Sequence, residues 1–175
     1  MFKTVVLLLF LASPLMAQDD ASRAWMAAGC GPNDISFDVK TDKKQHPTAQ
    51  PPAGKALVFV FANTIPDNAH IAIGGWISRF GVDGVWVGAT SMKSYFFFPI
   101  DPGEHHLCVS IQSKSVEAYS AAVSFSATAG SVYYFTTKDP NHPMPKEQVK
   151  LVALDPAEAD LYIASSPFST FHQKK

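Results

Sequence analysis

The feature that most constrains this fold is a series of short apolar or alternating runs, separated by turn residues, that begins at Lys55. The first run, Ala56–Phe61, is apolar at every position, which is typical of a central strand that is buried on both faces. The later runs are equally short, and glycine, proline and aspartate stand between them. This spacing predicts a mainly β fold, a small antiparallel β-sandwich of about eight strands.

A tight hairpin is predicted at Asp83-Gly84, which separates the runs Gly75–Val82 and Val85–Gly88. This dipeptide is the strongest short hairpin signal, because a type I′ turn needs positive φ at both of its central positions. A second turn is predicted around Pro102-Gly103, after which we expect His105–Ser113 to return antiparallel to the run before the turn, Ser94–Ile100. Alternation along the return strand would place Leu107, Val109 and Ile111 on the core face and His106, Cys108 and Ser110 on the other face.

One short helix is predicted near the C-terminus, at Pro156–Ala164. Asp155 is a good N-cap, proline suits the first helical position, and Glu158 completes the spacing of a capping box. Its apolar stripe is expected to be Ala157, Leu161 and Ala164.

The N-terminus has the pattern of a secretory signal peptide. A basic start at Lys3 leads into the uncharged run Val5–Ala12, and Ala17 precedes the acidic pair Asp19-Asp20. The run is well short of the roughly 20 residues that span a bilayer, so we expect cleavage after Ala17 rather than a membrane anchor. Lipid anchoring at Cys30 is not expected, because charged residues separate that cysteine from the apolar run. We therefore expect an exported protein, periplasmic or extracellular.

These patterns divide the chain into four predicted segments: the signal peptide 1–17, a lead-in 18–54 rich in proline and charge, the β-sandwich 55–164, and a tail 165–175 that is expected to fray. Phe37 and Val39 alternate as in one short strand within the lead-in. The mature chain is long enough for one domain and too short for two.

Cys30 and Cys108 are the two cysteines of the chain. In an oxidising compartment an isolated pair is most simply one disulfide, which would hold the lead-in across the outer face of the sheet. A metal site is the alternative, but two distant thiols have no CxxC spacing from which to build one. Neither a metal nor another cofactor is predicted.

Charge and motifs argue against several classes of function. With 14 Lys and Arg against 15 Asp and Glu, the chain has no basic stripe for nucleic acid. It contains no GxSxG elbow and no phosphate-binding glycine loop, so we do not expect an enzyme. His105 and His106 are the most tempting metal ligands, but neighbours on a strand point to opposite faces and cannot easily share an ion.

An ordered series of motifs resembles one bacterial family, catalogued as domain of unknown function 2846. The likeness covers about residues 53–164 and rests on Gly54–Phe61, Val82-Asp83-Gly84, Val87-Gly88, Ser94-Tyr95-Phe96, Pro102–His105, Ala129-Gly130 and Tyr133-Tyr134. The resemblance implies a small β-sandwich among signal-bearing envelope proteins, many of them lipoproteins, although this chain lacks a credible lipobox. The family has no established activity, so the resemblance carries over no functional residues.

Two functions remain as hypotheses. The first is a non-enzymatic envelope domain that binds a partner protein or assembly, for which we expect an exposed strand edge or apolar patch. The alternative is a cell-wall or glycan-binding module in which Trp76, Trp86 and Tyr95 stack on sugar rings. Against that alternative, we favour the interpretation that the same rings fill the sandwich core, where aromatic residues contribute most burial.

Overall fold

The computed structural model describes residues 30–63, 76–112, 120–138 and 149–174. The predicted signal peptide and its cleavage site lie outside these residues. Within the described ranges, no helix is both long and apolar enough to span a membrane.

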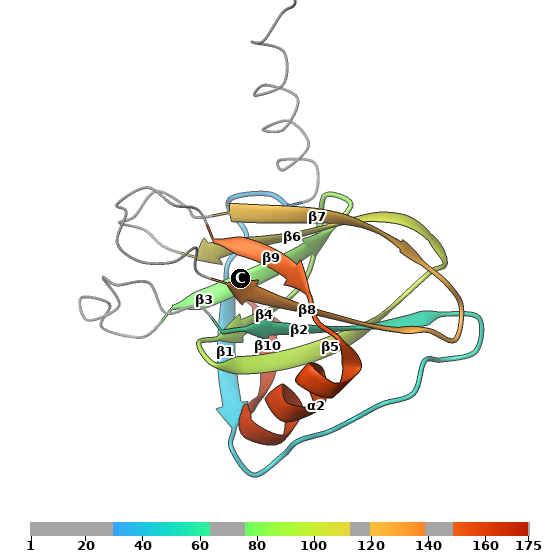
Figure 1. The fold of residues 1–175 in the computed structure, drawn as a ribbon. Coiled ribbons are helices and arrows are strands. Elements are labelled where there is room, and N and C mark those ends of the chain that lie inside the picture. The colour runs from blue at the N-terminus through green and yellow to red at the C-terminus, as the bar shows by residue number, and fades with distance from the viewer. Residues whose placement is uncertain (1–29, 64–75, 113–119, 139–148, 175) are drawn as a thin grey trace, which may run out of the picture.

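Two antiparallel-rich sheets pack face to face, as Figure 1 shows. The large sheet has the strand order β1-β10-β5-β2-β8-β9, and the small sheet has the order β4-β3-β6-β7. The predicted β-sandwich with one short helix is therefore confirmed, with ten strands in the described residues rather than about eight. The bounds are β1 Phe37–Asp42, β2 Ala56–Ala62, β3 Ile77–Val82, β4 Val85–Ser91, β5 Ser94–Ile100, β6 Gly103–Gln112, β7 Ser120–Ala127, β8 Val132–Lys138, β9 Lys150–Ala153, α2 Pro156–Ser165 and β10 Phe168–Gln173.

Strand β2 lies at the centre of the large sheet, and all seven of its residues are buried. It pairs antiparallel with β5 and parallel with β8. Val58 and Val60 face the core between the two sheets, whereas Leu57, Phe59 and Phe61 face a second cluster that includes residues of α2. The run is apolar at every position because one face meets the other sheet and the opposite face meets the helix.

Helix α2 begins as predicted, because the Asp155 side chain accepts a hydrogen bond of 2.9 Å from the backbone N–H of Glu158. The predicted apolar stripe is wrong. Ala159 and Ile163 are the buried residues, while Leu161 is 72% exposed. A short helix with apolar residues on more than one side has no single face defined by periodicity, so its docking against the large sheet selects the buried face.

The predicted pairing of the segments on either side of Asp101-Pro102 is also wrong. Strand β5 lies in the large sheet, and β6 pairs with β3 and β7 in the small sheet. The turn therefore carries the chain from one sheet to the other. A Pro-Gly turn specifies a reversal of the backbone, but it does not specify whether the two strands stay hydrogen-bonded to each other.

The tail, expected to fray, instead forms β10 between β1 and β5. Ser169 is buried and its hydroxyl lies 2.7 Å from that of Ser94, while the Phe171 ring packs edge-on against Phe96 at 5.0 Å. The sandwich thus extends beyond the predicted 55–164 at both ends, since β1, predicted as a short strand, pairs with β10.

The substitution Gly88→Ala tests the packing of β10 against β4 and β5. A Cβ atom at Gly88 would overlap ring atoms of Phe171 and Phe96, so we expect the free energy of unfolding to fall by about 1–3 kcal/mol. Urea denaturation measures the change. Val85→Ala on the same strand is the control, because Val85 is 64% exposed and its truncation should cost less than about 0.5 kcal/mol. Equal stability of the two variants would contradict the packing of β10 described above.

Candidate functional site

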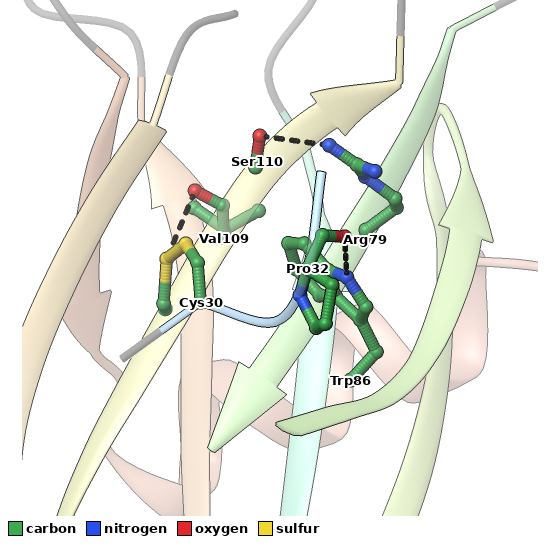
Figure 2. Close-up of a disulfide and its surroundings, with 7 residues drawn as sticks. Cys30, Pro32, Arg79, Trp86, Val109 and Ser110 are labelled. Atoms are coloured by element: carbon green, nitrogen blue, oxygen red, sulfur yellow. Dashed lines mark hydrogen bonds between the residues drawn. A yellow bond between two sulfur atoms is a disulfide. The ribbon is translucent and has the colours of Figure 1, made fainter. Parts of the chain in front are cut away.

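The predicted disulfide between Cys30 and Cys108 is present, with its two Cα atoms 5.1 Å apart. Cys108 lies on the outer face of β6, opposite the core residues Leu107 and Val109, and is fully buried. In Figure 2, the chain after Cys30 runs across the outer face of the small sheet. We call residues 30–36 the N-terminal strap.

The side chains of Arg79 on β3 and Trp86 on β4 lie beneath the strap and bind it (Figure 2). The Trp86 indole N–H donates to the carbonyl of Pro32 at 2.7 Å, and Arg79 Nη1 donates to the carbonyl of Ile35 at 2.6 Å. The guanidinium carbon lies 4.5 Å from the centre of the Trp86 ring, in a cation–π contact. Burial lowers the pKa of Arg79. Trp86 is therefore engaged in holding the strap.

The aromatic face that the sequence suggested does not form. Trp76 is 6% exposed and belongs to the core between the sheets, whereas Tyr95 is fully buried in the cluster beside α2. The Tyr95 hydroxyl donates to the carbonyl of Pro47 at 3.0 Å, and burial raises the pKa of Tyr95 to about 12. Trp76, Trp86 and Tyr95 thus serve three separate packing roles, which corrects their interpretation as one sugar-stacking surface.

The structure brings His105 and His106 to one carboxylate, although they are neighbours on β6. Asp83 stands in the β3–β4 turn, where it and Gly84 have φ of 50° and 85°, as the predicted tight hairpin requires. Asp83 Oδ2 lies 2.7 Å from Nδ1 of His105, and Oδ1 accepts from the backbone N–H of His106 at 2.8 Å. Within the described ranges, no group of three or more His, Cys, Asp or Glu residues could hold a metal ion.

Both ring nitrogens of His105 face oxygen atoms, because Nε2 lies 2.8 Å from the carbonyl of Asp101. A neutral imidazole can donate only one hydrogen bond, so this geometry favours the imidazolium. Burial opposes the charge, but the hydrogen bonds to Asp83 and Asp101 outweigh it and raise the pKa of His105. Burial likewise opposes ionisation of Asp83, and the hydrogen bonds from His105 and His106 lower its pKa overall.

Strand β7 is one of the two edge strands of the small sheet, the other being β4. Charged side chains and proline usually protect an exposed edge strand from pairing, and the eight residues of β7 include neither. Val123 and Phe125 pack against the core, and the alternate residues Ala122, Ser124 and Ser126 are small. Strand β9 of the large sheet lies nearby, but it is four residues long and forms no ladder with β7 in the described residues.

The register shows which backbone groups of β7 point outward. The backbone N–H and C=O of His106 bond to Asp83, on the side of β6 away from β7. Because Ser124 lies directly opposite His106, this antiparallel pair is a non-hydrogen-bonded one, and the backbone groups of Ser124 face the open edge. The same alternation applies to Ser120, Ala122 and Ser126. Every outward backbone group of β7 therefore belongs to a small residue.

Within the described residues, fold and site together define a small β-sandwich domain with a disulfide-anchored N-terminal strap and a strand edge at β7 that pairs with no further strand. The model of the family described as protein of unknown function (DUF2846) matches residues 52–148, more than half of the chain. The chain belongs to this family, which confirms the resemblance; β1, β9, α2 and β10 fall outside the match. No curated protein and no solved structure matches the chain.

The disulfide is expected to stabilise the domain substantially. Its two cysteines are 78 residues apart, so replacing both (Cys30→Ala with Cys108→Ala) should lower the free energy of unfolding by about 2–4 kcal/mol. Urea denaturation of the oxidised wild type and the double variant measures the loss. Reduction of the wild type should lower its free energy of unfolding by a similar amount, and reductant should not change the stability of the double variant. A variant as stable as the oxidised wild type would contradict the stabilising role of the strap.

The Asp83–His105 pair should make stability depend on pH. The raised pKa of His105 stabilises the fold fully below its ordinary value of 6.5, and this contribution is lost as pH rises through the folded-state pKa. Asp83, whose pKa is lowered from 3.8, stabilises the fold at pH values above 3.8, and this contribution is lost as pH falls through its folded-state pKa. We expect the free energy of unfolding to fall by less than about 1 kcal/mol from pH 5.5 to pH 8.5 in the wild type. In His105→Gln this fall should disappear. His172→Gln is the control, and an unchanged pH profile in His105→Gln would refute the assignment.

Proposed function

We propose that this protein is an exported, non-enzymatic domain of the bacterial cell envelope that binds a partner protein by accepting an extended segment of it along β7. The predicted signal peptide supports export to the periplasm or beyond. The disulfide supports an oxidising compartment, because such bonds persist outside the reducing cytosol.

The observation that carries the proposal is the unprotected edge of β7. A long edge strand without charge or proline normally invites pairing with another chain, and natural proteins usually block it. In strand addition, main-chain hydrogen bonds supply the affinity, and alternate side chains of the added strand enter the pockets beside the edge. Because Ala122, Ser124 and Ser126 are small, they leave room for the side chains of an added strand.

The placement of the ionisable residues supports binding rather than catalysis. Asp83 and His105 are committed to the β3–β4 turn, and Cys108 is in the disulfide. Arg79 is occupied by carbonyl groups of the strap. A catalytic group needs a free acid, base or nucleophile that can reach a substrate, and these residues already have structural partners.

The test compares two substitutions at Ser124 in the full-length, tagged protein expressed in its own cells. Ser124→Pro removes an outward N–H without breaking the β6–β7 ladder, and proline is tolerated on edge strands. Ser124→Ala removes the hydroxyl but keeps the N–H. After in-cell crosslinking and fractionation, we expect the envelope fractions to contain a discrete protein adduct with the wild type and Ser124→Ala, reduced at least about tenfold with Ser124→Pro.

Equal adducts from both variants would reject strand addition at β7. Attachment to cell-wall material without a protein adduct would reject the partner hypothesis and favour the glycan-binding alternative. Retention of the tagged protein in the cytosol would reject export. Circular dichroism of both purified variants confirms that each is folded before the adducts are compared.

A further inference from the structure

A hollow of about 630 Å³ lies where three segments meet at one end of the sandwich: the connection that follows β1, the β4–β5 turn, and the C-terminal end of α2. Figure 1 shows that this connection passes beside α2 on its way to β2. The side chains that matter to the argument are Lys43, His46, Asn63, Lys93, Tyr162 and Ser165. The volume is in the range of small-molecule sites.

The hollow is positively charged, although the chain as a whole carries a net charge of −1. Lys43 and Lys93 are exposed and form no ion pair with any described residue. Neither aspartate nor glutamate is among the described residues that line it. A neighbouring hollow shares Lys43 and adds Lys40 and Lys44, whereas its one acid, Asp42, accepts a hydrogen bond from the backbone N–H of Lys44. Such a cluster attracts anions.

Lys93 occupies a backbone conformation that lysine rarely adopts. Its φ is 54°, in the left-handed region favoured by glycine and asparagine, and its N–H donates to the carbonyl of Ala62 at 2.7 Å. A residue that occupies such a conformation against its backbone preference is a candidate for a functional role. What lysine supplies here, and glycine or asparagine would not, is an ammonium group at the rim of the hollow.

The wall of the hollow is held in place by hydrogen bonds of its own. His46 Nδ1 lies 2.8 Å from the carbonyl of Ile163 and 3.1 Å from that of Ser166, which ties the connection after β1 to the end of α2. The Asn63 side chain donates to the Tyr162 hydroxyl at 3.0 Å. A site assembled before the ligand arrives loses less entropy on binding.

We propose that this hollow binds the phosphate group of a small organic ligand, with Lys43 and Lys93 neutralising the phosphate and Tyr162 contacting the organic part. Two separate ammonium groups act as point charges, which suit the phosphate of either a monoester or a diester, whereas planar carboxylates are typically held by the fork of an arginine. The phosphate can belong to a soluble sugar phosphate or to the headgroup of an anionic phospholipid. Both sources share this chemistry, and the site does not depend on the β7 edge.

The experiment measures binding of glucose 6-phosphate by calorimetry and of phosphatidylglycerol vesicles by sedimentation, with glucose and phosphatidylcholine vesicles as uncharged or zwitterionic references. The test variant is Lys43→Gln with Lys93→Asn, since asparagine tolerates positive φ and should leave the fold stable. The control is Lys138→Gln with Lys150→Gln, which removes the same charge from the paired strands β8 and β9.

We expect saturable binding of one probe by the wild type and the control variant, weakened at least about tenfold in the test variant. Binding of glucose 6-phosphate identifies a soluble ligand, and binding of phosphatidylglycerol vesicles alone identifies a headgroup. The proposal is overturned if neither probe binds saturably, or if the control variant loses as much affinity as the test variant. Thermal unfolding of the variants checks that both remain folded.

Discussion

The arrangement of this domain depends on the burial of β2 on both faces. Each fully buried valine, leucine or phenylalanine stabilises a fold by about 1.5–3 kcal/mol, so a strand with seven buried residues cannot lie at a sheet edge or face solvent. One face requires the small sheet and the other requires α2, which together determine the layers of the molecule. The neighbours β5 and β8 then hold β2 from both sides, and the remaining strands extend outward from them.

Two segments outside the central strands cover the outer faces of the sandwich, α2 on one side and the N-terminal strap on the other. Helix α2 covers the large sheet through apolar contacts, whereas the N-terminal strap covers part of the small sheet through the disulfide and through hydrogen bonds from Arg79 and Trp86 to its carbonyl groups. Because the strap residues are all exposed or half-buried, hydrophobic burial contributes little to holding the strap, and the disulfide to Cys108 supplies a covalent anchor. Among the described residues, the edge of β7 pairs with no further strand, and the lysine-lined hollow is open at the surface.

These two surfaces suit recognition of different kinds. The β7 edge offers backbone hydrogen bonds and small side chains, which favour an extended polypeptide. The hollow offers two ammonium groups that form no ion pair with any described residue, an arrangement that favours a small anion. Meanwhile the aromatic residues, the conspicuous feature of the composition, are mostly structural: the Phe59 ring alone packs against those of Tyr95, Phe97 and Tyr134.

The amino-acid sequence by itself determined the features that depend on near neighbours: strand-forming alternation, the Asp83-Gly84 hairpin, the N-cap at Asp155, and the disulfide that follows from having two cysteines. It also sufficed to assign the family. Tertiary structure alone decided that β5 and β6 belong to different sheets, that the C-terminal tail forms β10, and which side of α2 is buried. It likewise decided that Trp76 and Tyr95 are internal and that Lys43 and Lys93 line one hollow. The reason is physical: turn and capping preferences act over a few residues, whereas strand partners and burial depend on contacts between segments far apart in the chain.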